Sequence, residues 1–93
     1  MSDDATSYEL RVTGPAQRQL GRLPEGTAAA IVEFMLTALV QNPHRVGARL
    51  QRELAGLHSA RRGAYRVVYE IDDDERVVIV LRIDHRSNVY RSL

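Results

Sequence analysis

The sequence has no cysteine and no lysine, and it has no long hydrophobic run. Without cysteine the chain can have no disulfide framework, no thiolate nucleophile and no cysteine-ligated metal site, which suits a reducing compartment. Its longest apolar stretch is far shorter than the ~20 residues that cross a bilayer. The acidic start, MSDDATSYEL, lacks the apolar segment of a signal peptide. We therefore expect a cytoplasmic protein with no membrane partner.

The lack of lysine leaves arginine to supply every fixed positive charge. All 13 residues of the lysine and arginine class are arginine, a bias for which the base composition of the genome is a sufficient cause. Guanidinium groups are planar donors that match phosphate, and they keep their proton, so none can act as a general base. The net charge of +1 conceals an uneven distribution: six arginines lie between residues 45 and 66 with Glu53 as the one acid, whereas five acids occupy the six positions from Glu70 to Glu75.

Length and hydrophobic pattern indicate one α+β domain of residues 1–93. With 93 residues and 44% apolar content, the chain can bury a single core. Residues 1–7 read as a flexible tail, and residues 44–56 fit either a helix or a loop. A helical hairpin is expected over residues 14–42, with Pro15 opening its first helix. Strands are expected at residues 8–12, 57–61, 65–72 and 76–86.

The last two strands are expected to pair as a hairpin around an acidic turn at residues 73–75. In this register apolar residues face each other, in the pairs Tyr65–Ile83, Val67–Leu81, Tyr69–Ile79 and Ile71–Val77. A shift by one residue would place Arg66 against an apolar residue and turn a whole face over. The paired apolar face should pack on the apolar stripe of the second helix, while Val78 and Val80 lie on the opposite face.

The same register gathers four arginines at one end of that opposite face. They are Arg62, Arg66, Arg82 and Arg86, in the cross-strand pairs Arg66–Arg82 and Arg62–Arg86. Like charges directly across a sheet destabilise it, so either Asp84 and Glu70 neutralise the group or an external anion does. The first alternative gives a solvated, salt-bridged surface. The second gives a phosphate-binding surface, because guanidinium groups bind phosphate in a bidentate manner.

The order of one strand, two helices and three strands resembles the RelE/ParE superfamily of bacterial toxins from type II toxin–antitoxin pairs. The resemblance extends from Tyr8 to the end of the chain through LPEGTAAAIVEFM, NPHRVGARL, ELAGLHSARRGAYRVVYEID and VVIVLRIDHRSNVY, and RRGAYRVVY and DHRSNVY are its most specific pieces. It implies an N-terminal strand and a helical hairpin packed on one face of a mainly antiparallel sheet. It also implies an antitoxin as partner.

RelE-type members are ribosome-dependent mRNA endonucleases, so the resemblance implies the ribosome and mRNA as further partners. Their metal-free chemistry, in which the ribose 2′-hydroxyl attacks the adjacent phosphate, needs no cofactor. The catalytic residues it implies are Arg66, Arg86, Tyr90 and His85. It also implies that Arg61 holds a neighbouring phosphate, and with the register and composition above we expect RNA or phosphate to be bound by Arg61, Arg62, Arg82 and His58. Arg66 would clamp the phosphate, and Tyr90 would stack on a base or transfer a proton.

The sequence departs from the RelE-type pattern where those enzymes often carry lysine, before the step Gly63-Ala64-Tyr65-Arg66. The base must then be His58, His85, Tyr90 or an acid such as Asp84. By strand alternation His85 shares the side of Ile83, and His44 reads as a loop residue without a role. Three histidines without carboxylates at ligand spacing do not indicate a metal site.

Two other readings stay open beside the endonuclease. A ParE-type inhibitor of DNA gyrase has the same fold without the nuclease residues, and an inactive scaffold would bind only its antitoxin. The presence of Arg66, Arg86 and Tyr90 together favours the endonuclease.

Overall fold

Five strands form one mixed sheet in the order β1-β5-β4-β3-β2. This computed structural model describes residues 7–51 and 55–85. The strands are β1 (Glu9–Val12), β2 (Ala48–Arg49), β3 (Leu57–Arg62), β4 (Tyr65–Asp72) and β5 (Val77–His85). Every neighbouring pair is antiparallel except β1 and β5, which are parallel. The expected mainly antiparallel sheet is confirmed.

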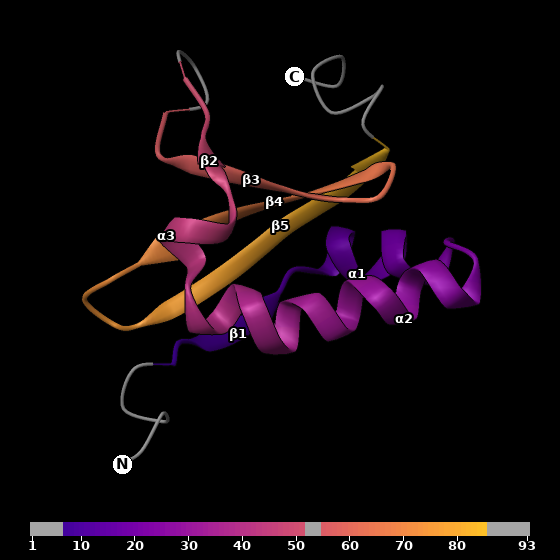
Figure 1. Cartoon of the computed structure of the whole chain (residues 1–93), viewed down its shortest axis with the longest axis horizontal. Helices are drawn as coiled ribbons and strands as arrows, with labels where there is room; N and C mark the ends of the chain where they lie inside the picture. The colour runs from indigo at the N-terminus through magenta and orange to yellow at the C-terminus, as the bar shows by residue number, and fades with distance from the viewer. Residues whose placement is uncertain (1–6, 52–54, 86–93) are drawn as a thin grey trace.

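The helices connect β1 to β2. They are α1 (Gly14–Gly21), α2 (Glu25–Phe34), a π-helical turn η2 (Met35–Leu39) that continues α2, and the short α3 (Pro43–Val46). Thr13 caps α1, because its Oγ1 accepts a hydrogen bond from the amide of Ala16 at 3.3 Å. The α1–α2 hairpin lies on one side of the sheet (Figure 1), as expected. Among the helices of the described ranges, none has both the length and the apolar character to span a bilayer.

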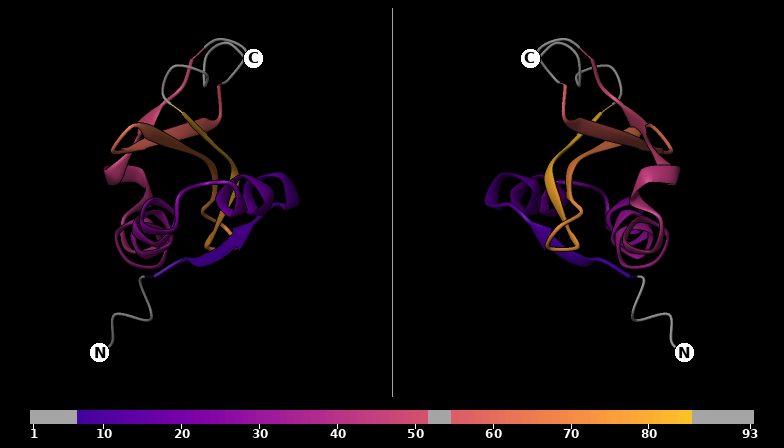
Figure 2. Two further views of the ribbon diagram at one scale, coloured as in Figure 1. Left: turned by 90° about the vertical axis from the view of Figure 1, so that its right-hand side faces the viewer. Right: turned by 90° about the vertical axis from the view of Figure 1, so that its left-hand side faces the viewer.

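The core lies between the helices and the sheet. Ile31, Phe34, Met35 and Leu39 meet Ala60, Val67, Tyr69, Val78, Val80 and Ile83 in one buried cluster. Figure 2 shows α2 nearly end-on, with the strands curving around it. Tyr69 is fully buried, and its hydroxyl donates a 2.6 Å hydrogen bond to the carbonyl of Pro43 at the start of α3. Truncating a core residue such as Leu39 to alanine typically costs about 2–5 kcal/mol.

The expected register of the β4–β5 hairpin is wrong. The strands pair as Tyr65–His85, Arg66–Asp84, Val67–Ile83, Val68–Arg82, Tyr69–Val80, Glu70–Ile79, Ile71–Val78 and Asp72–Val77, with a shift in register between Val68 and Tyr69. The turn has four residues rather than three, because Arg76 adopts a left-handed φ of 57° and the β4–β5 pairing begins at Asp72 and Val77. The amide of Glu75 donates a 3.0 Å hydrogen bond to the Asp72 carboxylate within this turn.

The corrected register changes which β5 residues face the core. Val78 and Val80 are buried against the helices, so their expected place on the arginine-bearing face is wrong. Leu81 is the extra residue of the bulge, and Thr13 holds it by donating from Oγ1 to the Leu81 carbonyl at 2.9 Å. Beyond β1, the edge of β5 is covered by α1, where the Gln19 side-chain oxygen accepts a 2.7 Å hydrogen bond from the Ile83 amide.

Candidate functional site

The outer side of β3, β4 and β5 carries a group of charged residues at one end. Ala60, Val67 and Ile83 point into the core, so their neighbours in each strand point away from the helices. These neighbours are Arg61, Arg66, Arg82 and Asp84, and together they are called the arginine face. Arg61 is paired with Arg66 and Arg66 with Asp84, which makes one row across three strands. Opposed residues of antiparallel strands lie about 4.5–5.5 Å apart at Cα, so these side chains begin side by side.

Asp84 organises the arginine face from within. Its Oδ2 accepts hydrogen bonds from Arg82 Nε at 2.7 Å and Arg82 Nη2 at 2.6 Å. Its Oδ1 lies 3.4 Å from the Gln19 side-chain amide nitrogen, at the limit of a hydrogen bond. Both members of the ion pair are mostly buried, with 23% of the Arg82 side chain and 14% of the Asp84 side chain exposed. The expected Arg66–Arg82 pair is therefore wrong, and an acid stands opposite Arg66 instead.

The arginine face is rich in positive charge by composition, because its four residues comprise three guanidinium groups and one carboxylate. Arg61 is exposed and Arg66 is half-buried, with its Nε enclosed. A partly enclosed stem loses less freedom when its guanidinium group meets a ligand, which is the preorganisation that favours electrostatic binding. Glu70 lies on the same side of β4, four residues beyond Arg66, where it faces Leu57 and Ile79.

Arg62 lies apart from the arginine face. It belongs to β3, opposite Tyr65, and its guanidinium carbon lies 4.9 Å from the centre of the Phe34 ring on the helix-covered side. Arg62 thus belongs to a different strand from Arg66, because the chain turns back at Gly63, which has a φ of 60°. The other member of the expected Arg62–Arg86 pair, Arg86, lies outside the described residues.

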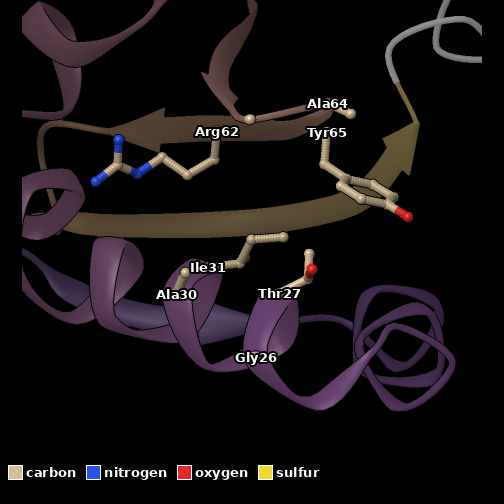
Figure 3. A pocket seen from close by; sticks show the side chains of 8 residues that line it. Gly26, Thr27, Ala30, Ile31, Arg62, Ala64 and Tyr65 are labelled. Atoms are coloured by element: carbon tan, nitrogen blue, oxygen red, sulfur yellow. The ribbon is translucent and has the colours of Figure 1, made fainter.

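Arg62 instead borders a cavity of about 440 Å³ between α2 and the β3–β4 turn. The cavity is lined by Gly26, Thr27, Ala30, Ile31, Arg62, Gly63, Ala64 and Tyr65. In Figure 3 the side chains of Arg62 and Tyr65 extend in different directions above α2. The cavity and the arginine face thus lie on opposite sides of the sheet.

The two histidines expected at the site also lie on the helix-covered side. His58 stacks on Tyr69 with 5.5 Å between ring centres, and only 7% of it is exposed. Burial lowers the pKa of His58, and the nearby His44 and Arg49 lower it further, which favours the neutral ring. His85 makes an edge contact with Tyr65 at 5.4 Å. It shares the side of Ile83, as strand alternation predicted.

The remaining expected site residues, Arg86 and Tyr90, lie outside the described residues. The structure therefore places Arg61, Arg66 and Arg82 together, and it separates Arg62, His58 and His85 from them.

Sequence reasoning missed residues at both ends of the sheet. His44 is on α3, with its Nε2 2.9 Å and 3.0 Å from the two oxygens of Asp73. The Tyr8 hydroxyl donates to the same carboxylate at 2.5 Å, and these hydrogen bonds, that of Tyr8 above all, lower the pKa of Asp73. At the other end, Ser59 faces the side of the arginine face, opposite Val68. Strand alternation on β3 was the one signal that could have placed Ser59 there.

Comparison with known proteins agrees with this architecture. The family model for the ParE toxin of the type II toxin–antitoxin system parDE matches residues 10–90. The chain is 54% identical to Toxin RelE of Mycobacterium tuberculosis over 91 residues, which is 98% of this chain and 93% of that protein. It is 51% identical to Toxin RelG of the same organism over 84 residues, which is 90% of this chain and 97% of that protein.

Solved structures show the same likeness. The crystal structure of the RelBE2 toxin–antitoxin complex from Mycobacterium tuberculosis contains a chain with a TM-score of 0.83 at 51% identity, covering 86% of this chain and 99% of that one. The intact Escherichia coli RelBE toxin–antitoxin complex has a TM-score of 0.70 at 20% identity, covering 85% of this chain and 96% of that one. At this lower identity the likeness shows the fold alone.

Proposed function

The chain belongs to the RelE/ParE superfamily of toxins from type II toxin–antitoxin systems, and from this premise we propose that it is a ribosome-dependent mRNA endonuclease that inhibits translation. The observation that carries the proposal is the row of Arg61, Arg66 and Asp84 across three strands, with Arg82 held against Asp84. An electrostatic site for a phosphodiester needs cations held in place beforehand, and this row supplies guanidinium groups held side by side on neighbouring strands.

In the proposed reaction, the 2′-oxygen of a ribose forms a bond with the adjacent phosphorus while the bond from phosphorus to the 5′-oxygen breaks. The 2′-hydroxyl loses a proton and the departing 5′-oxygen gains one. Negative charge grows on the phosphate between these events, and Arg66 is the group placed to stabilise it. Arg61, next to Arg66 on β3 and exposed, would hold a neighbouring phosphate.

The structure-based proposal has fewer candidates for the proton-transfer groups than the sequence alone. Arginine does not deprotonate, and Asp84 is engaged by Arg82. His58 and His85 lie on the helix-covered side. We assign the proton transfers to Tyr90, and the stabilisation of charge on the phosphate to Arg66 and Arg86.

The proposed regulator is a cognate antitoxin. The similar mycobacterial chain comes from a toxin–antitoxin complex. An excess of positive charge on the arginine face suits an acidic segment of such a partner, whose carboxylates would meet Arg61 and Arg66 and compete with phosphate. This role would place the protein in the cytoplasm, with the ribosome and mRNA as further partners.

The test is the expression of the wild-type chain followed by mapping of mRNA 5′ ends. We expect new ends within translated regions, and none when translation initiation is blocked. Because the matching family model is that of the ParE toxin, inhibition of DNA gyrase is the second candidate function. A supercoiling assay with purified gyrase separates the two: inhibited supercoiling without new mRNA ends would replace the endonuclease by the gyrase inhibitor.

A further inference from the structure

Ser59 is a buried polar residue beside the arginine face. It lies on β3 two residues before Arg61, on the same side of the sheet, and opposite Val68 on β4. Only 7% of Ser59 is exposed, and its hydroxyl oxygen is enclosed without a hydrogen-bond partner. The hydroxyl is therefore an unused donor and acceptor next to the proposed phosphate clamp.

An enclosed hydroxyl without a partner costs stability. Most buried polar atoms are hydrogen-bonded, and a group left unpaired loses its hydrogen bonds to water without forming new ones in the protein. Alanine would fill the same place in the strand without this cost, as Ala60 does on the other side of β3. An unpaired buried group in a folded protein calls for an explanation, and a role at a functional site is one that the neighbouring arginine face offers.

The geometry identifies Arg66 as that partner. Since Ser59 pairs with Val68 and Arg61 pairs with Arg66, the side chains of Ser59 and Arg66 are diagonal neighbours on one face. Diagonal neighbours in a sheet lie about 7–8 Å apart, within reach of a long side chain. The Nε of Arg66 is enclosed as the Ser59 oxygen is, so both polar atoms are shielded from water on the same side of the sheet.

We propose that Ser59 is a positioning residue for Arg66, whose Nε–H donates a hydrogen bond to the Ser59 oxygen when the guanidinium group engages a phosphate. A guanidinium group can meet a phosphate along either of two edges, one that includes Nε and one formed by the two terminal nitrogens. Engagement of Nε by Ser59 leaves the terminal edge for the phosphate and fixes the plane of the fork. The inference rests on the proposed role of Arg66 as the phosphate clamp, and it adds Ser59 as the residue that sets the orientation of that clamp.

The first test compares activity and stability for Ser59→Ala and Ser59→Thr. We expect Ser59→Ala to lower kcat for ribosome-bound mRNA by about 10- to 100-fold, the range of a hydrogen bond to a charged group, with KM unchanged. Its Tm should stay level or rise by roughly 4–8 °C, because an unpaired buried group is removed. Ser59→Thr keeps the hydroxyl and should recover most of the activity. If Ser59→Ala lowers both Tm and kcat, or if both variants lose the same amount of activity, Ser59 has a packing role and the proposal is overturned.

Two further comparisons separate positioning from other roles. In an Arg66→Ala background, Ser59→Ala should have no further effect on cleavage, whereas an added loss would mean that Ser59 touches the substrate itself and would overturn the proposal. Val68→Ala is the matched packing control, since Val68 faces Ser59 and is only 2% exposed. It should lower Tm while the folded fraction keeps its cleavage rate.

A binding test without catalysis keeps the inference separate from the proposed function. Inorganic phosphate is titrated into the full wild-type chain while the Arg66 Nε–H signal is followed by NMR. We expect phosphate to slow hydrogen exchange at this Nε–H in the wild type and in Val68→Ala, but not in Ser59→Ala. No slowing in the wild type, or equal slowing in Ser59→Ala, overturns the inference. If phosphate slows exchange at this Nε–H only when Ser59 is present, but the chain does not cut mRNA, the proposed endonuclease function is overturned and the inference about Ser59 stands.

Discussion

Charged residues at the two ends of the sheet differ in how they are paired. At the β4–β5 turn, the Asp73 carboxylate receives the Tyr8 hydroxyl and His44, and Arg76 lies over the Tyr8 ring at 4.4 Å. These contacts join the start of β1, α3 and the turn, so the charge is used within the fold. At the arginine face three guanidinium groups lie beside one carboxylate, that of Asp84, which Arg82 binds. The charge at the turn therefore links three segments of the fold, whereas the charge of the arginine face is gathered on one side of three neighbouring strands.

The largest expected effect is that of Arg66→Ala. Losing one preorganised contact to the developing charge should lower mRNA cleavage by about 10²–10³-fold, with little change in Tm. Arg66→Lys should recover little, because a point charge cannot replace the planar fork. Cleavage kinetics on translating ribosomes, with a melting curve for each variant, check this. Full cleavage by a well-folded Arg66→Ala protein would remove the residue from the mechanism.

A second variant breaks the internal pairing of the arginine face. In Asp84→Asn, Arg82 loses its carboxylate while both positions stay mostly enclosed. We expect the free energy of unfolding to fall by roughly 1.5–3 kcal/mol, the range for a hydrogen bond to a charged group. Denaturant melts measure this loss. Unchanged stability would show that the Arg82–Asp84 pair contributes nothing to the fold.

His58 predicts a pH dependence of stability at the turn end of the sheet. Its pKa in the folded protein lies below the ordinary value of 6.5, from burial first and then from His44 and Arg49. The unfolded chain therefore takes up a proton at His58 before the folded one does, and stability should fall as the pH drops below 6.5 toward the lowered pKa. In His58→Phe this part of the acid loss should disappear. Identical stability-versus-pH curves for the two proteins would contradict the assignment.

The smallest effect is expected at the exposed turn. The pKa of Asp73 is lowered by its hydrogen bonds from Tyr8 and His44, so its stabilising contribution is present above the ordinary aspartate pKa and is lost as the pH falls through the lowered folded value. Asp73→Asn should therefore reduce Tm slightly at pH 7, and the difference from the wild type should vanish in acid. A difference that persists at low pH would mean that the turn is shaped by something other than this charge.

The layers of the fold were predictable because local signals agree with them. Pro15 and Pro24 mark where the helices begin and part, and apolar spacing along α2 identifies the residues that cover the sheet. Alternation on β4 placed Val67 and Tyr69 in the core correctly. Each of these signals depends on only a few neighbouring residues, so a wrong strand register elsewhere in the chain does not affect the prediction made from it.

The register was not predictable, and the site depended on it. Residues 77–81 are all apolar, so either face of β5 could have been the buried one. The four-residue turn relies on a left-handed Arg76, where no glycine or asparagine signals it. One added turn residue and one bulge put Asp84 opposite Arg66 in place of Arg82. The presence of an arginine cluster could be predicted, but its internal neutralisation by Asp84 could not.

The salt dependence of RNA binding tests the central claim that the arginine face is a phosphate site. Binding of a short single-stranded RNA to the full chain is measured over a range of salt concentrations for the wild type, Arg66→Ala, Arg61→Ala and Arg11→Ala. Arg11 is the control, an exposed strand arginine 3.3 Å from Glu9 at the other end of the sheet. Each phosphate contact contributes about −0.7 to the slope of log K against log salt, so Arg66→Ala and Arg61→Ala should each make the slope shallower by about that amount, and Arg11→Ala should leave it unchanged. Equal slopes for wild type and Arg66→Ala would contradict the claim.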